Sequence, residues 1–398
     1  MLLLDLDRFK DINDALGHSA GDRLLKLVGA RLLEAVRRSD TVARLGGDEF
    51  VLVVDGATGR ETGEQVARHV LSSFAQPFEL DGESLHVRVS IGVVLFPEHG
   101  ETPEMLLKNA DLAMYRAKEG GRDTFAFYSK ELNDQVVRRL AVEAALRRAL
   151  TSGGVEVFYQ PKITQPGNVI AGAEALVRLR RDDGSLVSPV DFIPVAENTG
   201  LIMPLSDFVL REACRQVVLW RAGRHKSFHM AVNLSPRQFQ QPGLTERIRA
   251  ILEETGAPPE ALEFEITENL LMDSRGETLD TLSALRAMGA SIALDDFGKE
   301  YSSLSYIKKL PIQAIKIDRA FIDGLPSDED DASIVRSVLS LAQGLELRVV
   351  AEGVETRAQL DFLVAQGCRE FQGYLFSKPV PALDMTALLE QPSPFDAV

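Results

Sequence analysis

In the second half of the chain, short apolar runs repeatedly end in a carboxylate, an amide or a lysine. The runs GAEAL, MAVNLS, LEFEIT, SIALDD, AIKID and RVVAEGVE carry Glu174, Asn233, Glu265, Asp295 with Asp296, Lys316 and Glu352. Strands that alternate with helices form a parallel sheet, and a closed (β/α) barrel carries its active site at the carboxyl ends of its strands. One such residue could simply be polar because a strand ends there. Six in order predict one dense acidic site.

Several carboxylates in one pocket repel one another unless cations lie among them. Carboxylate and amide oxygens are hard ligands that suit Mg²⁺. The residues themselves therefore predict a divalent metal site at this end of the barrel.

The first half of the chain carries a smaller acidic group. A Gly-Gly turn separates two strand-like runs, and glycine accepts the positive φ of a tight hairpin, so Asp48 and Glu49 would project from it. Asp5 and Asp7, at the end of the first strand, would lie nearby if that strand pairs with the hairpin. Such ligands suit Mg²⁺ carrying a nucleoside triphosphate. A polar hairpin beside a charged strand end fits the same facts.

The elements that must position these residues divide near residue 130. The first part predicts a strand at 2–7, a helix at 21–38, a hairpin at 43–54, a helix at 61–74, a strand at 86–96, a helix at 103–118 and a strand at 124–128. This order predicts an α+β sandwich with helices on one face of a mainly antiparallel sheet.

Apolar positions near helical spacing predict a helix over 129–150 that links two domains. From Val155 to about Leu389, strands and helices alternate about eight times, which predicts an α/β TIM-like (β/α)8 barrel. We therefore assign 1–128 to the first domain, 129–150 to a linker helix, 151–390 to the barrel and 391–398 to a tail.

The composition, 45% hydrophobic and 26% charged over 398 residues, is that of a soluble globular protein. A net charge of -15 argues against binding a nucleic-acid polymer, which needs clustered Lys and Arg. Cys214 and Cys368 lack metal-ligand spacing and are expected to be reduced core thiols. MLLLDLD is too short for a signal peptide and no run of 18 apolar residues occurs, so a cytoplasmic chain without a membrane segment is expected.

Longer motifs resemble two known families. LGGDEF, preceded by DLDRFKDINDALGHSAGD, resembles the GGDEF family of diguanylate cyclases, which join two GTP molecules into cyclic di-GMP. EALVRL, VNLSPRQF, EITE, DDFG, YSSLSYIKKLPIQAIKID, AEGVET and QGYLFSKPV resemble the EAL family of metal-dependent phosphodiesterases, which open cyclic di-GMP to the linear dinucleotide pGpG. Together the matches cover nearly the whole chain, which therefore resembles a tandem GGDEF–EAL protein.

For the barrel, this resemblance implies two-metal hydrolysis of cyclic di-GMP with Mg²⁺ or Mn²⁺. The implied catalytic residues are Glu174, Lys316 and Glu352, with Glu352 orienting or deprotonating the attacking water. The implied metal ligands are Glu174, Asn233, Glu265, Asp295 and Asp296. Arg178, Gln372 and Glu355 match substrate-side positions, and Glu268 matches an anchor of the loop after the fifth strand. A surface ion pair is the alternative for Arg178, Glu268 and Glu355.

For the first domain, the resemblance implies Asp5 and Asp48 as metal ligands, assisted by Glu49 and the Leu6 carbonyl, and GTP as a possible ligand. Asn13 and Asp22 match guanine-reading positions, and Lys118 and Arg122 match phosphate contacts. Arg37 and Asp40 match the family's RxxD inhibitory site; a helix C-terminus carrying two arginines is the alternative. Since two GTP-loaded domains meet in this family, a homodimer is implied.

The sequence departs from these families at two places. The first domain lacks the helical DxLTxLxNR-like segment that normally precedes its first strand, so we expect it to regulate the barrel rather than make cyclic di-GMP. Lys299 and Glu300 follow DDFG where the EAL family has a small residue and a glycine. If that glycine needs positive φ, its replacement costs roughly 1–2 kcal/mol, and a slow enzyme is expected. A non-catalytic cyclic di-GMP receptor and a bifunctional cyclase/phosphodiesterase are the alternatives.

Overall fold

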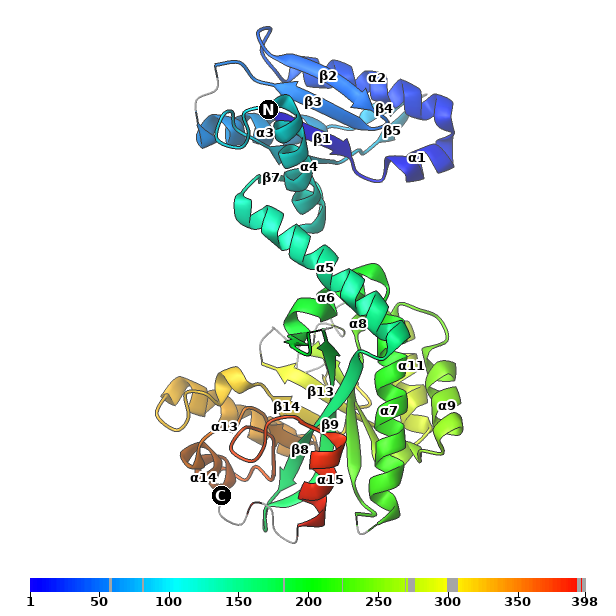
Figure 1. Cartoon of the computed structure of the whole chain (residues 1–398), viewed down its shortest axis with the longest axis vertical. Helices are drawn as coiled ribbons and strands as arrows, with labels where there is room; N and C mark the ends of the chain where they lie inside the picture. Colours follow the sequence, from blue (N-terminus) through cyan, green and yellow to red (C-terminus); the bar gives the residue numbers. More distant parts are fainter. Residues whose placement is uncertain are drawn as a thin grey trace. The chain divides into compact units, whose positions relative to one another are not determined.

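The computed structural model describes residues 1–56, 59–80, 82–181, 183–223, 225–268, 270, 276–298, 307–391 and 395. Contacts between residues divide the chain into two compact units, Met1–Leu140 and Ala141–Val398 (Figure 1). None of the helices in these ranges combines the length and apolarity that a bilayer crossing needs.

The first unit is built on a five-stranded sheet in the order β2-β3-β1-β6-β7. Its strands are β1 (Leu2–Leu6), β2 (Thr41–Gly46), β3 (Glu49–Val53), β6 (Val89–Val93) and β7 (Phe125–Phe127). Strand β1 pairs antiparallel with β3 and β6, and only β6 and β7 run parallel. A separate small hairpin joins β4 (Phe78–Leu80) to β5 (Glu83–Leu85). The predicted antiparallel sheet with its Gly-Gly hairpin is confirmed.

Helices cover both faces of this sheet. They are α1 (Phe9–Leu16), α2 (His18–Glu34), α3 (Arg60–Phe74) and α4 (Pro103–Glu119). Leu2 and Leu4 pack with residues of α2 and α3, whereas Leu3 packs with Met114 of α4. The prediction that the helices lie on one face was wrong. Successive side chains of a strand point to opposite faces, so a continuous apolar run such as LLL requires cover on both.

A single helix, α5 (Lys130–Ser152), occupies the segment where a helix was predicted. Its last turns belong to the second unit, where Val142, Leu146 and Ala149 are buried with Leu179 and Phe192. This apolar stripe at helical spacing fixes that end of the helix against the barrel.

The second unit contains a closed eight-stranded barrel. Its strands are β8 (Val155–Thr164), β9 (Val169–Arg180), β11 (His229–Asn233), β12 (Leu262–Thr267), β13 (Ser291–Phe297), β14 (Ala314–Ile317), β15 (Arg348–Ala351) and β16 (Glu370–Phe371). Two short strands, β10 (Leu186–Val187) and β17 (Val380–Pro381), pair with β9 and β8. The TIM-like barrel is confirmed.

Strand β8 departs from our prediction. Regular alternation of strands and helices would make all barrel strands parallel. From β9 to β16 each strand is parallel to the next, but β8 is antiparallel to both of its neighbours. No helix separates β8 from β9, because residues 165–168 form a tight connection in which Gly167 and Asn168 have positive φ. Pro, Gly and Asn are residues that favour such turns.

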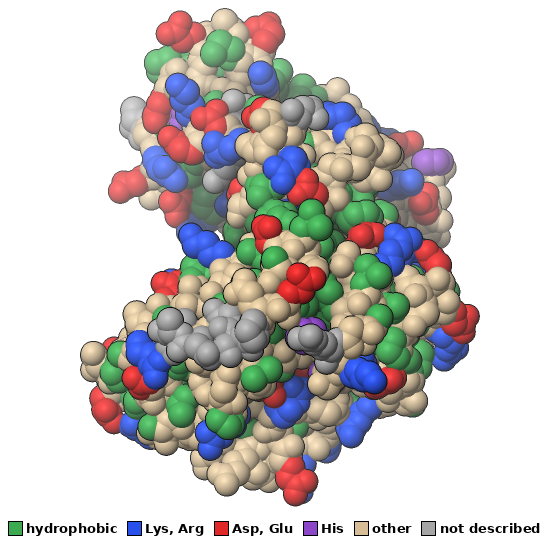
Figure 2. Space-filling view, turned by 60° about the horizontal axis from the view of Figure 1, so that its bottom comes forward, with side chains coloured by type: hydrophobic (Ala, Val, Ile, Leu, Met, Phe, Trp, Pro, Cys, Tyr) green, Lys and Arg blue, Asp and Glu red, His purple; other side chains and the backbone are tan. Residues whose placement is uncertain are grey.

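Helices surround the barrel on the outside (Figure 1). They are α6 (Pro189–Thr199), α7 (Ile202–Ala222), α8 (Pro236–Phe239), α9 (Leu244–Thr255), α11 (Gly276–Ala287), α13 (Glu329–Gly344), α14 (Arg357–Ala365) and α15 (Ala382–Glu390), with 3₁₀ turns η1 (Pro259–Ala261) and η2 (Arg319–Phe321). Cys214 of α7 and Cys368, in the connection between α14 and β16, are buried free thiols, as predicted. Figure 2 shows basic side chains interspersed with acidic ones, without a continuous basic surface among the described side chains of that face.

Candidate active site at the carboxyl ends of the barrel strands

The carboxyl ends of neighbouring strands bring the predicted acidic residues together. Asn233 of β11 is level with Glu265 of β12, and Thr267 of β12 is level with Asp295 of β13. Because alternate residues of a barrel strand face the interior, Glu265 and the residues level with it on the adjacent strands project toward the barrel axis.

The Lys316 ammonium lies at the centre of this group. Its Nζ is 2.6 Å from Glu265 Oε2, 3.2 Å from Asp295 Oδ1, 3.6 Å from Glu174 Oε2 and 2.5 Å from Glu352 Oε1. Lys316 is only 1% exposed. Burial alone would lower the pKa of Lys316, but the four surrounding carboxylates raise it well above its usual range. The lysine is therefore held as a cation.

Two amide side chains fix the Glu174 carboxylate. Asn233 Nδ2 donates to Glu174 Oε1 at 2.7 Å, and Gln372 Nε2 donates to Glu174 Oε2 at 2.6 Å. Gln372 Nε2 also donates to Gln160 Oε1 at 3.0 Å. Gln372, predicted at the substrate, thus lies in direct contact with the carboxylate cluster.

One ammonium does not offset the negative charge of this cluster. Burial raises the pKa of Glu352 to about 8; Lys316 opposes the rise, and Asp295, Glu174 and Glu265 add to it. Burial also raises the pKa of Glu265. For Glu174, burial acts in the same direction, but Lys316 brings its pKa below the usual value.

Hard oxygen donors with excess negative charge fit a divalent cation. Among the side chains that the structure describes, however, no three acidic, histidine or cysteine groups enclose one point as a finished metal site. The Lys316 ammonium lies between the carboxylates instead.

The remaining predicted barrel residues make contacts of their own. The Arg178 guanidinium lies 5.5 Å from the Phe158 ring centroid and lines a cavity of about 290 Å³ together with Asn233. Glu268 is buried and accepts a hydrogen bond from Gly298 N at 3.4 Å, which ties the end of β12 to the end of β13. Glu355 forms an ion pair of 2.8 Å with Arg319, the alternative considered from sequence.

Asp296 follows Asp295 with a left-handed backbone at φ 57°, an uncommon conformation outside glycine. Its backbone N–H donates to Asp295 Oδ1 at 3.0 Å. Lys299 and Glu300, where the sequence departs from the EAL pattern, lie outside the described residues.

The predicted acidic site of the first unit is also assembled. Asp5 of β1 is level with Glu49 of β3, and Lys118 Nζ of α4 lies 2.7 Å from Asp5 Oδ1. Burial raises the pKa of Asp5, Lys118 opposes the rise, and Asp48 adds to it. Burial and the neighbouring carboxylates raise the pKa of Glu49 as well. The four side chains therefore share one electrostatic environment.

Asp7 has a different environment from Asp5. It accepts hydrogen bonds from Ser90 Oγ at 2.8 Å and from the backbone of Asp123 at 3.1 Å, and Arg122 Nε lies 3.9 Å away. Arg122 thus contacts the residue next to the predicted metal ligands rather than the ligands themselves.

The predicted guanine-reading residues lie on two consecutive helices. Asn13 of α1 packs against Gly21 of α2, so closely that a Cβ at Gly21 would stand 2.0 Å from Asn13 Oδ1. Asn13 thus lies beside Gly21, the residue before Asp22. The Asp22 side chain is exposed.

Arg37 and Asp40 lie in the turn that follows α2. The Asp40 carboxylate accepts hydrogen bonds from the backbone N–H of Arg37 at 2.9 Å and of Asp55 at 3.3 Å. Both residues line a cavity of about 400 Å³. Asp40 therefore stabilises the turn in which it lies.

Sequence reasoning missed the charged residues beneath the site. Lys162 of β8 contacts Glu263 and Glu265 of β12, and Arg348 of β15 contacts Glu263 and Glu370. Their signal was the strict alternation in LEFEIT, which places Glu263 on the same face as Glu265. A TIM barrel is usually filled by branched apolar side chains, and this one has a charged interior.

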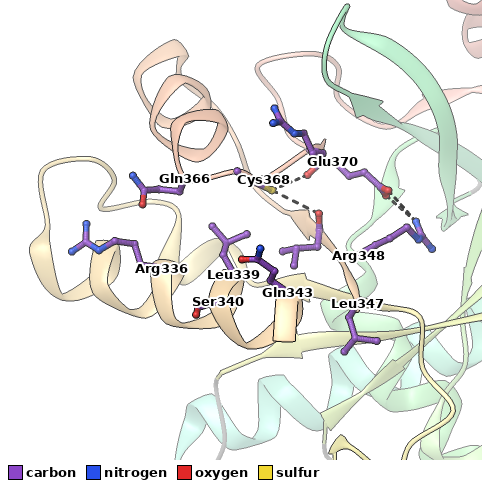
Figure 3. A pocket seen from close by; sticks show the side chains of 12 residues that line it. Arg336, Leu339, Ser340, Gln343, Leu347, Arg348, Gln366, Cys368 and Glu370 are labelled. Atoms are coloured by element: carbon purple, nitrogen blue, oxygen red, sulfur yellow. Dashed lines mark hydrogen bonds and ion pairs between the residues drawn. The ribbon is translucent and has the colours of Figure 1, made fainter. Parts of the chain in front are cut away.

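A larger cavity, of about 550 Å³, lies at the other ends of the strands (Figure 3). It is lined by residues of α13 and by those that begin β15 and β16, among them Arg348, Cys368 and Glu370. None of the predicted site residues lines it. Size alone therefore does not identify the active site here.

Comparisons with known proteins match a different domain family to each of the two units. The EAL domain model matches residues 143–379, and the diguanylate cyclase GGDEF domain model matches residues 1–124. The chain is similar to the bifunctional diguanylate cyclase/cyclic di-GMP phosphodiesterase MucR of Pseudomonas aeruginosa, with 42% identity over 387 residues, 97% of this chain and 56% of MucR. It is also similar to the cyclic di-GMP phosphodiesterase NbdA of the same species, with 41% identity over 96% of this chain and 48% of NbdA. The chain spans about half the length of these relatives.

Among solved structures, the chain is similar to the PaMucR phosphodiesterase in complex with c-di-GMP. The sequences are 43% identical, the TM-score is 0.60, and the match covers 62% of this chain and 99% of that one. The charged strand ends, the eight-stranded barrel and the two domain matches lead to the same conclusion: this chain belongs to the family of proteins that carry a GGDEF domain and an EAL domain in tandem.

Proposed function

We propose that the barrel hydrolyses cyclic di-GMP to the linear dinucleotide pGpG. The observation that carries this proposal is the convergence of Glu174, Glu265, Asp295 and Glu352 on Lys316 at the carboxyl ends of the strands. Membership of the EAL family and similarity to NbdA, a named cyclic di-GMP phosphodiesterase, support the choice of substrate.

Divalent metal ions complete the proposed site. Glu174, Asn233, Glu265, Asp295 and Asp296 would hold Mg²⁺ or Mn²⁺, which when bound supplies a Lewis acid for the phosphate and an acidified water. The excess negative charge and the hard oxygen donors of the cluster support this assignment.

In this proposal Glu352 and Lys316 act on the attacking water. The Glu352 carboxylate would accept the proton of this water. Burial raises the pKa of Glu352, and divalent cations bound beside it would lower that pKa and keep the carboxylate ionised. Lys316, 2.5 Å from Glu352 Oε1, donates to the water oxygen and orients a lone pair toward phosphorus. The water oxygen forms the new P–O bond as the bond from phosphorus to the ribose 3′ oxygen breaks. The departing 3′ oxygen takes up a proton from solvent and becomes a hydroxyl, which opens the ring.

The other predicted residues orient the substrate. Arg178, which lines the cavity beside Asn233, would contact a phosphate. Gln372, which holds Glu174, and Glu355, which pairs with Arg319, would lie at the substrate side. Glu268 holds the end of β13 in place through Gly298.

Product analysis tests this function directly. The purified chain is incubated with cyclic di-GMP and Mg²⁺ or Mn²⁺, and the products are separated by chromatography. We expect pGpG from the parent chain and none from Glu174→Ala. A parent chain that binds cyclic di-GMP tightly without converting it would instead be a receptor.

We further infer that the first domain, residues 1–128, binds GTP and regulates the barrel, residues 151–390, through the linker helix at 129–150. Asp5 and Asp48 would hold the metal of the nucleotide, Lys118 and Arg122 its phosphates, and Asn13 and Asp22 its guanine. Pairing of two such domains would give a homodimer. Calorimetric titration with Mg²⁺–GTP tests the binding.

Bifunctionality is the second candidate, because MucR is named as both a cyclase and a phosphodiesterase. Incubation of a Glu174→Ala variant with GTP distinguishes the two, since any cyclic di-GMP that is formed would then accumulate.

A further inference from the structure

Lys162 is a buried lysine with two carboxylate partners inside the barrel. Its Nζ lies 2.8 Å from Glu263 Oε1 and 2.7 Å from Glu265 Oε1, and the residue is 7% exposed. Both distances are those of charge-assisted hydrogen bonds, which are about twice as strong as neutral ones.

The two lysines divide the oxygens of Glu265 between them. Oε1 accepts from Lys162 and Oε2 accepts from Lys316 at 2.6 Å, and the carboxylate is fully buried. A carboxylate held at both oxygens cannot rotate about its last bond without losing one partner. Lys162 therefore fixes which oxygen of Glu265 faces the site.

Glu263 has other partners besides Lys162. Arg348 contacts Glu263 Oε2, and Ser291 Oγ lies 3.4 Å from the same oxygen. Figure 3 shows that Arg348 also pairs with Glu370. The two side chains approach to 3.0 Å, and Arg348 is partly exposed. The lower part of the network can thus persist without the lysine.

Stability alone does not account for these buried charges. Replacing a buried ion pair by apolar residues of similar volume is often neutral or stabilising, and apolar layers fill most TIM barrels. Glu265, by contrast, has no exposed surface through which water could replace a lost partner. Lys162 is therefore expected to act by holding the Glu265 carboxylate.

We propose that Lys162 is a positioning residue that holds Glu265 from beneath, so that its second oxygen is presented to the metal. The inference rests on the proposed function, in which Glu265 is a metal ligand. Residues that orient metal ligands typically contribute 10- to 100-fold to metal affinity or activity.

The test compares a double variant with a matched control. Lys162→Met with Glu263→Leu removes the Lys162–Glu263 pair together and leaves Glu265 held by Lys316 alone, whereas Glu263→Leu alone keeps Lys162 on Glu265. Mn²⁺ affinity is measured by calorimetry on the full chain without substrate, beside the melting temperature and the kcat and KM for cyclic di-GMP.

We expect the double variant to bind Mn²⁺ about 10- to 100-fold more weakly and to lose kcat with little change in KM, while Glu263→Leu stays within about threefold of the parent. Lys162→Gln provides a second measurement, with the same expected loss, if the double variant melts below the assay temperature.

Equal Mn²⁺ affinity in all variants would overturn the inference and leave the proposed function standing. Equal loss in the double variant and in Glu263→Leu would also overturn it, because the effect would belong to the network and not to Lys162. A parent chain that neither binds Mn²⁺ nor hydrolyses cyclic di-GMP would remove the proposed function and this inference together.

Discussion

The two units each carry a carboxylate cluster with a lysine, but the clusters differ in their access to water. Lys118 pairs with Asp5 at 2.7 Å while about a third of its side chain stays exposed. Lys316 is almost fully buried and faces four carboxylates at once. Solvent can screen the first cluster, whereas the second depends on protein groups or bound cations. Lys118 is thus one of several groups that can stabilise the carboxylates of the first unit, since water is another. The buried carboxylates of the second unit depend on Lys316 or on bound cations.

The largest expected effect is on hydrolysis by the buried cluster. Glu174→Ala removes a carboxylate that Asn233 and Gln372 hold in place, and we expect cyclic di-GMP hydrolysis to fall by about 100- to 10,000-fold. Asp361→Ala, which removes an exposed carboxylate paired with Arg357, serves as the control and should keep the parent rate. The rate of pGpG formation decides, and a Glu174→Ala rate within tenfold of the parent would contradict the assignment.

Matched lysine substitutions test the difference in burial. Lys316→Met leaves buried carboxylates without their cation, and we expect a loss of about 3–5 kcal/mol in the free energy of unfolding of the second unit. Lys118→Met should cost about 1 kcal/mol in the first unit, because the Lys118 side chain itself is 29% exposed. Calorimetric melting in EDTA measures both, and losses of equal size would show that burial does not separate the two clusters.

Metal removal sharpens the same comparison. A ligand present at about 100 times its Kd stabilises the folded state by about 2.7 kcal/mol. Addition of Mg²⁺ after EDTA treatment is therefore expected to raise the melting temperature of the second unit by several degrees, with a smaller rise in the first unit when GTP is absent. If both transitions move together, the clusters do not differ in cation affinity.

The smallest effect concerns the turn after α2. Asp40→Ala removes an acceptor for two backbone N–H groups, and should destabilise the first unit by about 1 kcal/mol. Arg37→Ala keeps its backbone N–H and should change stability by less than about 0.5 kcal/mol. Denaturant unfolding separates the two outcomes. A loss on Arg37→Ala as large as on Asp40→Ala would contradict the structural role that we assign to Asp40.

The convergence of polar strand ends could be predicted from sequence, since a parallel barrel brings all carboxyl ends to one rim. Glu174, Asn233, Asp295, Lys316 and Glu352 are accordingly close together. Their catalytic and metal-binding roles remain predictions.

The charge network beneath the site could not be predicted in the same way. Lys162 lies on β8, which runs antiparallel to its neighbours, and this direction depends on a four-residue turn that links β8 directly to β9. The position of α4 was missed for a related reason. Alternation along LLLDL shows that both faces of β1 need cover, but not which helix supplies it.

The reversed direction of β8 has a consequence for how this barrel can be joined to other modules. Val155 pairs with Leu179 near the end of β9, whereas Thr164 pairs with Val169 at its start. The chain therefore enters the barrel at the rim that carries the acidic cluster, while a barrel made only of parallel strands would be entered from the opposite end. A segment that ends in α5 is therefore joined to the barrel at the rim of the acidic cluster and not at the opposite rim.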